Sequence, residues 1–185
     1  MVITERLTLE EFLALPEEKP SLEYESGRVT QKVSPQGKHS RLQLEVPNLF
    51  NAFTVPRKLA MAFTELRATF AGYSRVPDVS IYLWERIPLD DSGEVANEFF
   101  EPPDIVVEIV SPGQSVNALV RRCLWFVEHG VRATLLLDPT DKSALLIRPD
   151  HTTIGLHGPD QIDLQDILPG FQLAVQDLFE SLTIR

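Results

Sequence analysis

The segment from Pro102 to Pro112 constrains the fold more than any other part of the chain. It is a short apolar run, rich in β-branched residues and with proline at both ends. Such a run is typical of a strand that is buried on both faces of a sheet. Glu108 interrupts the run between Val107 and Ile109. Because an ionised carboxylate that is buried without a partner is strongly unfavourable, we expect Glu108 to be paired, metal-bound or protonated.

Length and composition indicate a globular protein. The 185 residues, 43% of them hydrophobic and 24% charged, suffice for one domain with a substantial core, so we expect residues 1–185 to form a single domain. The single cysteine, Cys123, excludes an internal disulfide and a cysteine-built zinc site. Since we find neither a signal peptide nor a run of the ~20 apolar residues of a membrane helix, we expect a cytoplasmic protein without a membrane partner.

The charge of the chain is unevenly distributed. A formal net charge of −10 argues against a protein that coats nucleic acid non-specifically. Residues 26–44, however, carry only basic charges, whereas residues 85–108 carry eight acids against Arg86 alone. The basic residues of the first stretch are Arg28, Lys32, Lys38 and Arg41. This stretch is therefore either a local site for a polyanion or an ordinary solvated face.

Periodicity and turn signals predict a mixture of strands and helices. We expect helices over residues 9–15, 38–53, 115–129 and 175–182, with Thr8 and Ser115 as N-caps of the first and third. Pro47 lies inside the second helix, where a proline is expected to kink it or to begin a new segment. We expect strands in a hairpin of residues 22–25 and 28–33, then at 65–70, 75–84, 103–111, 133–139 and 143–148, with a last strand or turn before the C-terminal helix.

The strands around Asp78 and Glu108 predict where the chemistry lies. If residues 77–84 and 103–111 are antiparallel neighbours, the start of one strand lies beside the end of the other, and Asp78 faces Glu108 or Val110. Asp104 would then lie roughly 14 Å from Glu108, four residues along the same strand. The carboxylate pair is therefore Asp78 with Glu108.

Two carboxylates so close together repel each other unless a cation or a shared proton intervenes. A hard divalent ion such as Mg²⁺ suits oxygen ligands, often one or two carboxylates with water and phosphate. The backbone carbonyl of Ile109 would add a third oxygen. An ion pair or a hydrogen bond would explain the pair equally well.

The order of these motifs resembles a known family. Pro77-Asp78 on one strand and Glu108 on the next resemble the PD-(D/E)XK nuclease superfamily, and the wider pattern is similar to its Uma-type restriction endonuclease family. The matching segments are residues 22–27, His39, residues 76–79, 103–112, 130–131 and 137–139. The resemblance implies an α/β (α+β) fold, with a mixed central β-sheet flanked by helices and an N-terminal β-hairpin. It also implies hydrolysis of DNA phosphodiester bonds with Mg²⁺ or Mn²⁺. We expect such an enzyme to act as a homodimer, because two DNA strands are commonly cut by paired sites.

The resemblance assigns roles to residues of this chain. Asp78 and Glu108, with Ile109, would ligate the metal ion. The superfamily places a lysine two residues after the glutamate, where this chain has Val110, and the Uma-type branch places it on the following helix, where this chain has Arg122. Arginine stabilises charge on a phosphate but cannot lose its proton near neutral pH, so the metal ion would have to activate water. Alternatively, Arg122 only neutralises Glu108 in a decayed domain that binds nucleic acid or protein.

Four further residues are candidates for accessory roles. His39 would contact phosphate or position water, or serve only as a polar residue at a helix start. Glu23 would be a further acid near the metal ion, or a solvent-facing strand residue. Ser111 and Gln114 would bind phosphate, or merely cap the following helix.

Overall fold

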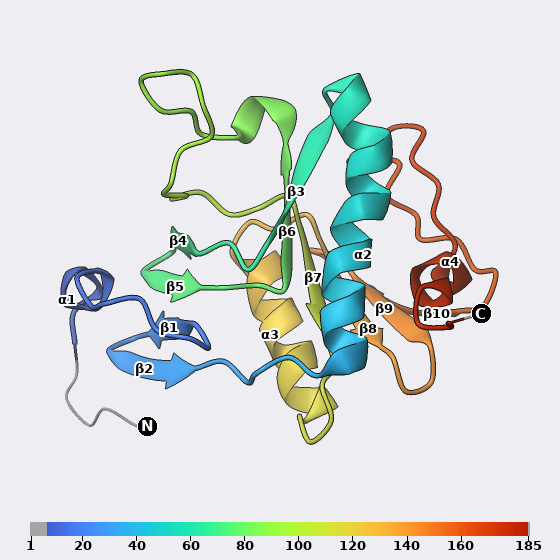
Figure 1. Ribbon diagram of the computed structural model, residues 1–185, viewed down its shortest axis with the longest axis horizontal. Coiled ribbons are helices and arrows are strands. Elements are labelled where there is room, and N and C mark those ends of the chain that lie inside the picture. Colours follow the sequence, from blue (N-terminus) through green and yellow to red (C-terminus); the bar gives the residue numbers. More distant parts are fainter. Residues whose placement is uncertain (1–6, 185) are drawn as a thin grey trace.

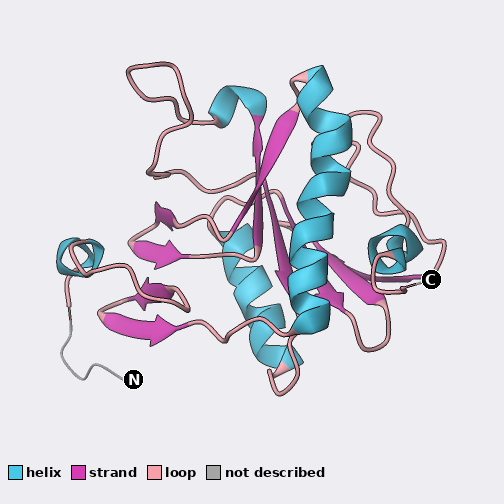
Figure 2. Ribbon diagram, in the orientation of Figure 1, coloured by secondary structure: helices cyan, strands magenta, loops and turns pink. Residues whose placement is uncertain are grey.

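The computed structural model describes residues 7–184 (Figures 1 and 2). The main sheet is mixed and has the strand order β10-β9-β8-β7-β6-β3, in which only β7 and β8 are parallel. Its strands are β3 (Ala60–Thr64), β6 (Val79–Leu83), β7 (Ile105–Ile109), β8 (Ala133–Asp138), β9 (Ser143–Ile147) and β10 (Thr153–His157). This mixed sheet, flanked by helices, confirms the predicted fold class.

A second, antiparallel sheet has the order β2-β1-β5-β4 and lies to one side of the main sheet, next to α1 (Figure 1). Its strands are β1 (Leu22–Glu25), β2 (Arg28–Gln31), β4 (Ala68–Phe70) and β5 (Tyr73–Arg75). The β1–β2 pair is the predicted N-terminal hairpin, with Ser26 and Gly27 at its turn, both at positive φ.

The helices are α1 (Leu9–Leu13), α2 (Gly37–Thr54), α3 (Val116–Glu128) and α4 (Val175–Glu180), with short 3-10 turns at Val55–Arg57 and Trp84–Arg86. Thr8 and Glu11 form the predicted capping box of α1, and Ser115 accepts the predicted N-cap hydrogen bond of α3. Pro47 does not begin a new segment, because α2 continues through this residue as one helix. No helix within residues 7–184 is both long enough and apolar enough to span a membrane.

The alternation of side chains along β7 explains why its apolar run is continuous. Ile105, Val107 and Ile109 pack in the core cluster that contains the apolar face of α2. Val106 and Val110 point to the other face, where they meet residues of α3. Because a helix covers each face, every residue of β7 is buried, as expected for a strand between two helical layers.

Two of the strand predictions are wrong in their bounds. Of the strand expected at 65–70, only the last three residues form a strand, β4; the preceding strand, β3, ends before this range and belongs to the other sheet, and Glu65 follows it at φ 46. The strand expected at 75–84 is divided between β5 and β6, with Pro77 between the two. Local propensity identifies extended residues but does not show where the chain passes from one sheet to another.

Candidate active site

The site lies where β6 begins and β7 ends. The two strands are antiparallel neighbours, as predicted, and Val79 pairs with Val107. Continuing this register by one residue places Asp78 opposite Glu108, with both side chains on the α3 face. A cavity of about 180 Å³ opens beside them and is lined by, among others, Glu23, Lys32, His39, Asp78, Glu108 and Arg122.

Asp78 is buried and accepts hydrogen bonds on both carboxylate oxygens. Lys32 Nζ donates to Oδ1 at 2.8 Å, and Oδ2 is 3.0 Å from His39 Nε2 and 2.8 Å from the backbone N–H of Ile109. Burial alone would raise the pKa of Asp78, but the hydrogen bond from His39 and the charge of Lys32 outweigh it and hold the pKa far below its usual range. An ionised Asp78 requires His39 Nε2 to carry a proton and donate it.

Arg122, on α3, joins two other carboxylates. Its Nε donates to Glu108 Oε1 at 2.6 Å, and its two terminal nitrogens donate to the two oxygens of Glu23 at 2.7 Å each. Glu23 also accepts the backbone N–H of Val76 at 2.7 Å. The pKa of Arg122 would be lowered by burial, yet Glu108 and Glu23 raise it well above its ordinary value. Arg122 is therefore a fixed cation and cannot act as a general base.

The two acids bound by Arg122 respond differently to their surroundings. Burial raises the pKa of Glu108, and the nearby charge of Asp78 adds to this effect, so the pKa stays above its usual value despite Arg122. Glu23 is also buried, which would raise its pKa. The charge and hydrogen bonds of Arg122 prevail there, and the pKa of Glu23 is lowered. Opposing shifts of this kind among clustered acids are typical of functional sites, although structural ion pairs produce them as well.

Lys32 belongs to the basic stretch of residues 26–44, but it was not predicted as a residue of this site. It follows β2, and its Nζ also donates to the backbone oxygen of Val76 at 2.8 Å. Strand alternation contained a signal for it, because Glu23 pairs with Thr30 and side chains at positions 30 and 32 share a face. Burial would lower the pKa of Lys32, but the charges of Asp78 and Glu108 raise it. Lys32 is thus a second permanent cation at the site.

Ser111 and Gln114 line the same cavity, at the loop between β7 and α3. The backbone N–H of Ser111 donates to Gln114 Oε1 at 2.9 Å, and the backbone N–H of Gln114 donates to the backbone oxygen of Ser111 at 3.1 Å. These bonds close the loop. Val110 is buried against α3, so the position two residues after Glu108 offers no polar group to the site.

The chemistry of the donor set suits a hard cation, which prefers oxygen ligands. Asp78 and Glu108 supply carboxylate oxygens. The β6–β7 register, continued further, pairs Ile109 with Pro77, which has no N–H to donate to the Ile109 carbonyl. Within residues 7–184, no three His, Cys, Asp or Glu side chains converge as a metal-binding group. A divalent ion would therefore use the carboxylate pair, the Ile109 carbonyl, water and substrate oxygens, once the cation on Asp78 moves away.

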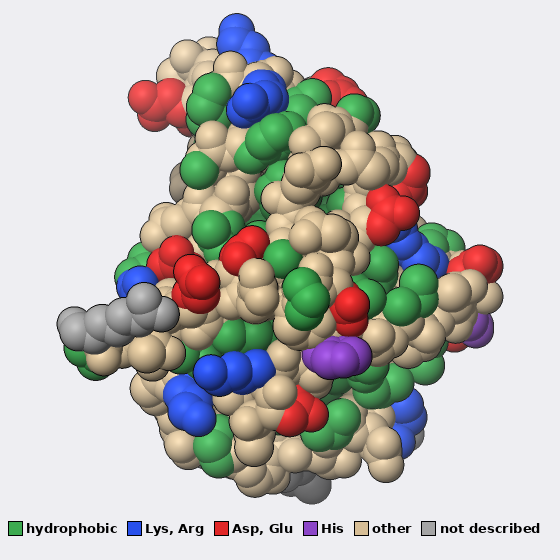
Figure 3. All heavy atoms as spheres, turned by 90° about the vertical axis from the view of Figure 1, so that its right-hand side faces the viewer, with side chains coloured by type: hydrophobic (Ala, Val, Ile, Leu, Met, Phe, Trp, Pro, Cys, Tyr) green, Lys and Arg blue, Asp and Glu red, His purple; other side chains and the backbone are tan. Residues whose placement is uncertain are grey.

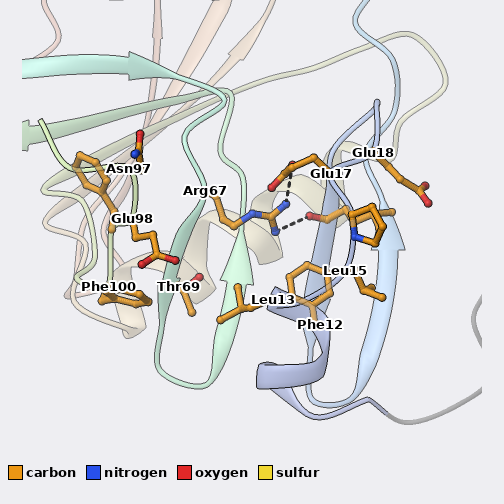
Figure 4. Close-up of a pocket in the computed structure, with 13 residues that line it drawn as sticks. Phe12, Leu13, Leu15, Glu17, Glu18, Arg67, Thr69, Asn97, Glu98 and Phe100 are labelled. Carbon is orange, nitrogen blue, oxygen red and sulfur yellow. Dashed lines mark hydrogen bonds and ion pairs between the residues drawn. The ribbon is translucent and has the colours of Figure 1, made fainter.

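A second cavity, also of about 180 Å³, lies beside α1 on the other face of the small sheet (Figure 4). Arg67 reaches into it from one wall and points towards Glu17, 3.6 Å away (Figure 4). Its Nη1 donates to the backbone oxygen of Leu22 at 3.1 Å and to Ser74 at 3.3 Å, so this nitrogen is already engaged within the fold. None of the residues predicted for the site lines this cavity.

The face of the molecule over its C-terminal segment, at the right of Figure 1, shows acidic and basic side chains interspersed (Figure 3). The cations at the candidate site, Lys32 and Arg122, are instead engaged with carboxylates inside the fold.

Comparison with known proteins supports the relationship that the motifs suggested. A sequence model of the Uma2 family, described as "Putative restriction endonuclease", matches residues 9–176. The structure is similar to the crystal structure of a "putative nuclease belonging to DUF820" from Anabaena variabilis ATCC 29413, with a TM-score of 0.90 and 39% sequence identity. The similarity covers 96% of this chain and 99% of that chain. A comparison with curated proteins finds no match.

Proposed function

Because this chain belongs to the Uma2 family, we propose that it is a divalent-metal-dependent endonuclease that hydrolyses DNA phosphodiester bonds. One observation carries the proposal: Asp78 and Glu108 lie across from each other on antiparallel strands and line one cavity. The protein of the crystal structure to which this chain is 39% identical is described as a "putative nuclease", which supports the same reaction class.

Each residue of the site would have a separate role in the reaction. Asp78, Glu108 and the carbonyl of Ile109 would hold Mg²⁺ or Mn²⁺, which when bound lowers the pKa of water and stabilises charge on a phosphoryl oxygen. Arg122 keeps its charge in the buried site and stabilises negative charge that develops on the phosphate. His39 donates to Asp78 and orients that carboxylate. Arg122 and Lys32 both carry raised pKa values, so neither serves as the base.

A second candidate function rests on the same contacts. Every carboxylate of the site already has a cation within 2.8 Å: Lys32 on Asp78, and Arg122 on Glu108 and Glu23. Such a closed network of ion pairs would also suit a domain that has lost catalysis and binds nucleic acid or protein. The two functions differ in one respect, namely whether a metal ion reaches the carboxylate pair.

Incubation of the purified protein with supercoiled, linear and branched DNA, in Mg²⁺, Mn²⁺ or EDTA, tests the proposal. We expect nicking that EDTA abolishes and that Asp78→Asn or Glu108→Gln reduces roughly 10²-fold or more, as for loss of one preorganised electrostatic group. Glu128→Gln, at an exposed acid on α3, is the control and should cut like wild type.

Absence of metal-dependent cleavage on all three DNA forms would favour the second function. The homodimer, expected because paired sites commonly cut two strands, is tested separately by sedimentation in the presence and absence of DNA.

A further inference from the structure

Lys32 occupies the carboxylate that the proposed metal ion needs. Its Nζ lies 2.8 Å from Oδ1 of Asp78, and only 13% of its side chain is exposed. The other oxygen of Asp78 is engaged by His39 and by the N–H of Ile109. A divalent ion ligated by Asp78 would lie roughly 2.0–2.6 Å from a carboxylate oxygen. The ion and the ammonium would then be within a few ångström of each other and would repel.

The two cations of the site differ in how firmly they are held. Arg122 makes three short bonds, one to Glu108 and two to Glu23, in the rigid forked geometry of a guanidinium. Lys32 holds its carboxylate through one ammonium at the end of a flexible four-carbon stem. The residue follows the last residue of β2 and lines the cavity. Departure of the ammonium breaks one hydrogen bond to Asp78 and one to the backbone oxygen of Val76, and rotation of the stem suffices for it. Departure of Arg122 would leave two buried acids without a partner.

On the premise of the proposed function, we infer that Lys32 is an internal competitor of the divalent metal ion: its ammonium takes the place of the ion on Asp78 and must move away before the ion binds. In the metal-free protein, the same ammonium relieves the repulsion between Asp78 and Glu108, both of which are buried. The affinity of the site for metal is consequently weaker than the carboxylate pair alone would provide.

Mn²⁺ binding to the DNA-free protein, measured by calorimetry and by the electron paramagnetic resonance of free Mn²⁺, tests this inference. Lys32→Met and Lys32→Gln remove the ammonium and should bind Mn²⁺ at least about tenfold more tightly than wild type, which corresponds to about 1.4 kcal/mol. Lys32→Arg retains a cation and should remain close to wild type. Lys38→Met removes the same charge from an exposed position on α2 and is the matched control; it should leave the affinity unchanged.

Several results would overturn the inference. These are an affinity in Lys32→Met and Lys32→Gln that is equal to or weaker than in wild type, an equal gain in Lys38→Met, or no Mn²⁺ binding by any variant. Binding that persists when Asp78→Asn is added to Lys32→Met would place the ion elsewhere and would overturn it too. The two neutral variants differ in shape. If circular dichroism shows that one of them does not fold, the Mn²⁺ affinity of the other still tests the inference. Because no DNA is present, a protein with the expected affinities that cuts no DNA would contradict the proposed function and leave the role of Lys32 intact.

Discussion

Arg122 connects residues that are distant in the sequence. It is 14 residues from Glu108 and 99 residues from Glu23, yet it donates to both carboxylates. Each of these acids is buried and would be unfavourable as an unpaired charge. Arg122 therefore contributes both to the stability of the fold and to the positive charge of the site, whichever of the two functions holds.

Substitutions at Arg122 separate these two contributions. Arg122→Met keeps much of the bulk, removes the charge and strands Glu108 and Glu23, so we expect a loss of about 3–5 kcal/mol in the free energy of unfolding. If the site is catalytic, the same change should lower the nicking rate roughly 10²–10³-fold. Arg122→Lys keeps a cation and places there the residue type of the resembled family, so cleavage should be retained or increased, with a smaller loss of stability.

Urea denaturation and nicking of supercoiled DNA, measured on the same three proteins, check this. Metal-dependent nicking that persists unchanged in Arg122→Met would show that Arg122 has no part in the reaction. Nicking by Arg122→Lys alone would identify a decayed nuclease that one substitution restores.

At the scale of the element, α3 brings Arg122 to the sheet. Its buried stripe of Leu119, Cys123, Phe126 and Val127 packs on the face of β7 and β8 that also carries Glu108. Position 122 adjoins this stripe, so its guanidinium reaches the acids at the edge of the apolar contact. Since the first turn of α3 has no acidic residue, its N-terminus relies on the cap at Ser115, which accepts from the N–H of Ala118 at 3.3 Å.

We therefore expect Ser115→Ala to lower the free energy of unfolding by about 1 kcal/mol, the usual effect of losing an N-cap. Ser115→Asp restores an acceptor and adds a charge that is favourable at a helix N-terminus, so it should equal or exceed wild type. Chemical denaturation followed by circular dichroism measures both. If the alanine and aspartate variants were equally destabilised, the hydrogen bond to Ala118 would not be what stabilises the start of α3.

At the scale of the whole molecule, α3 packs on the main sheet so closely that the only cysteine is inaccessible. Cys123 has no exposed surface and is packed between α3 and the strands. Burial, and to a smaller extent the charge of Glu108, raises the pKa of its thiol to about 12. Because the thiolate is the reactive form, Cys123 should be inert while the fold is intact.

Modification of Cys123 by a chromogenic disulfide reagent at mildly alkaline pH should thus report opening of the fold. We expect negligible reaction of the native protein, rapid reaction in guanidinium chloride, and a rate that rises through the unfolding transition. Metal ions that bind the native site should slow it further by mass action. Fast labelling without denaturant would mean that α3 separates from the sheet far more readily than its packing indicates.

Much of this architecture could be predicted from the sequence, because its determinants are local. The run around Glu108 required a strand buried on both faces, Thr8 and Ser115 marked helix starts, and Ser26-Gly27 marked the hairpin turn. The antiparallel pairing of the strands that bear Asp78 and Glu108 was a premise of the predicted site, and the register of β6 and β7 confirms it. Given that pairing, the two-residue alternation of strands is enough to bring the two acids together.

Only the tertiary structure decided which charges meet. Side-chain alternation put Lys32 and Glu23 on one face of the hairpin, but nothing local placed that face against Asp78 and Arg122. The division of the extended residues around Glu65 and Pro77 between two sheets was also decided there. The physical reason is that ion pairs between residues 46 or 99 positions apart depend on how whole elements pack, and packing is selected by the burial of the entire core.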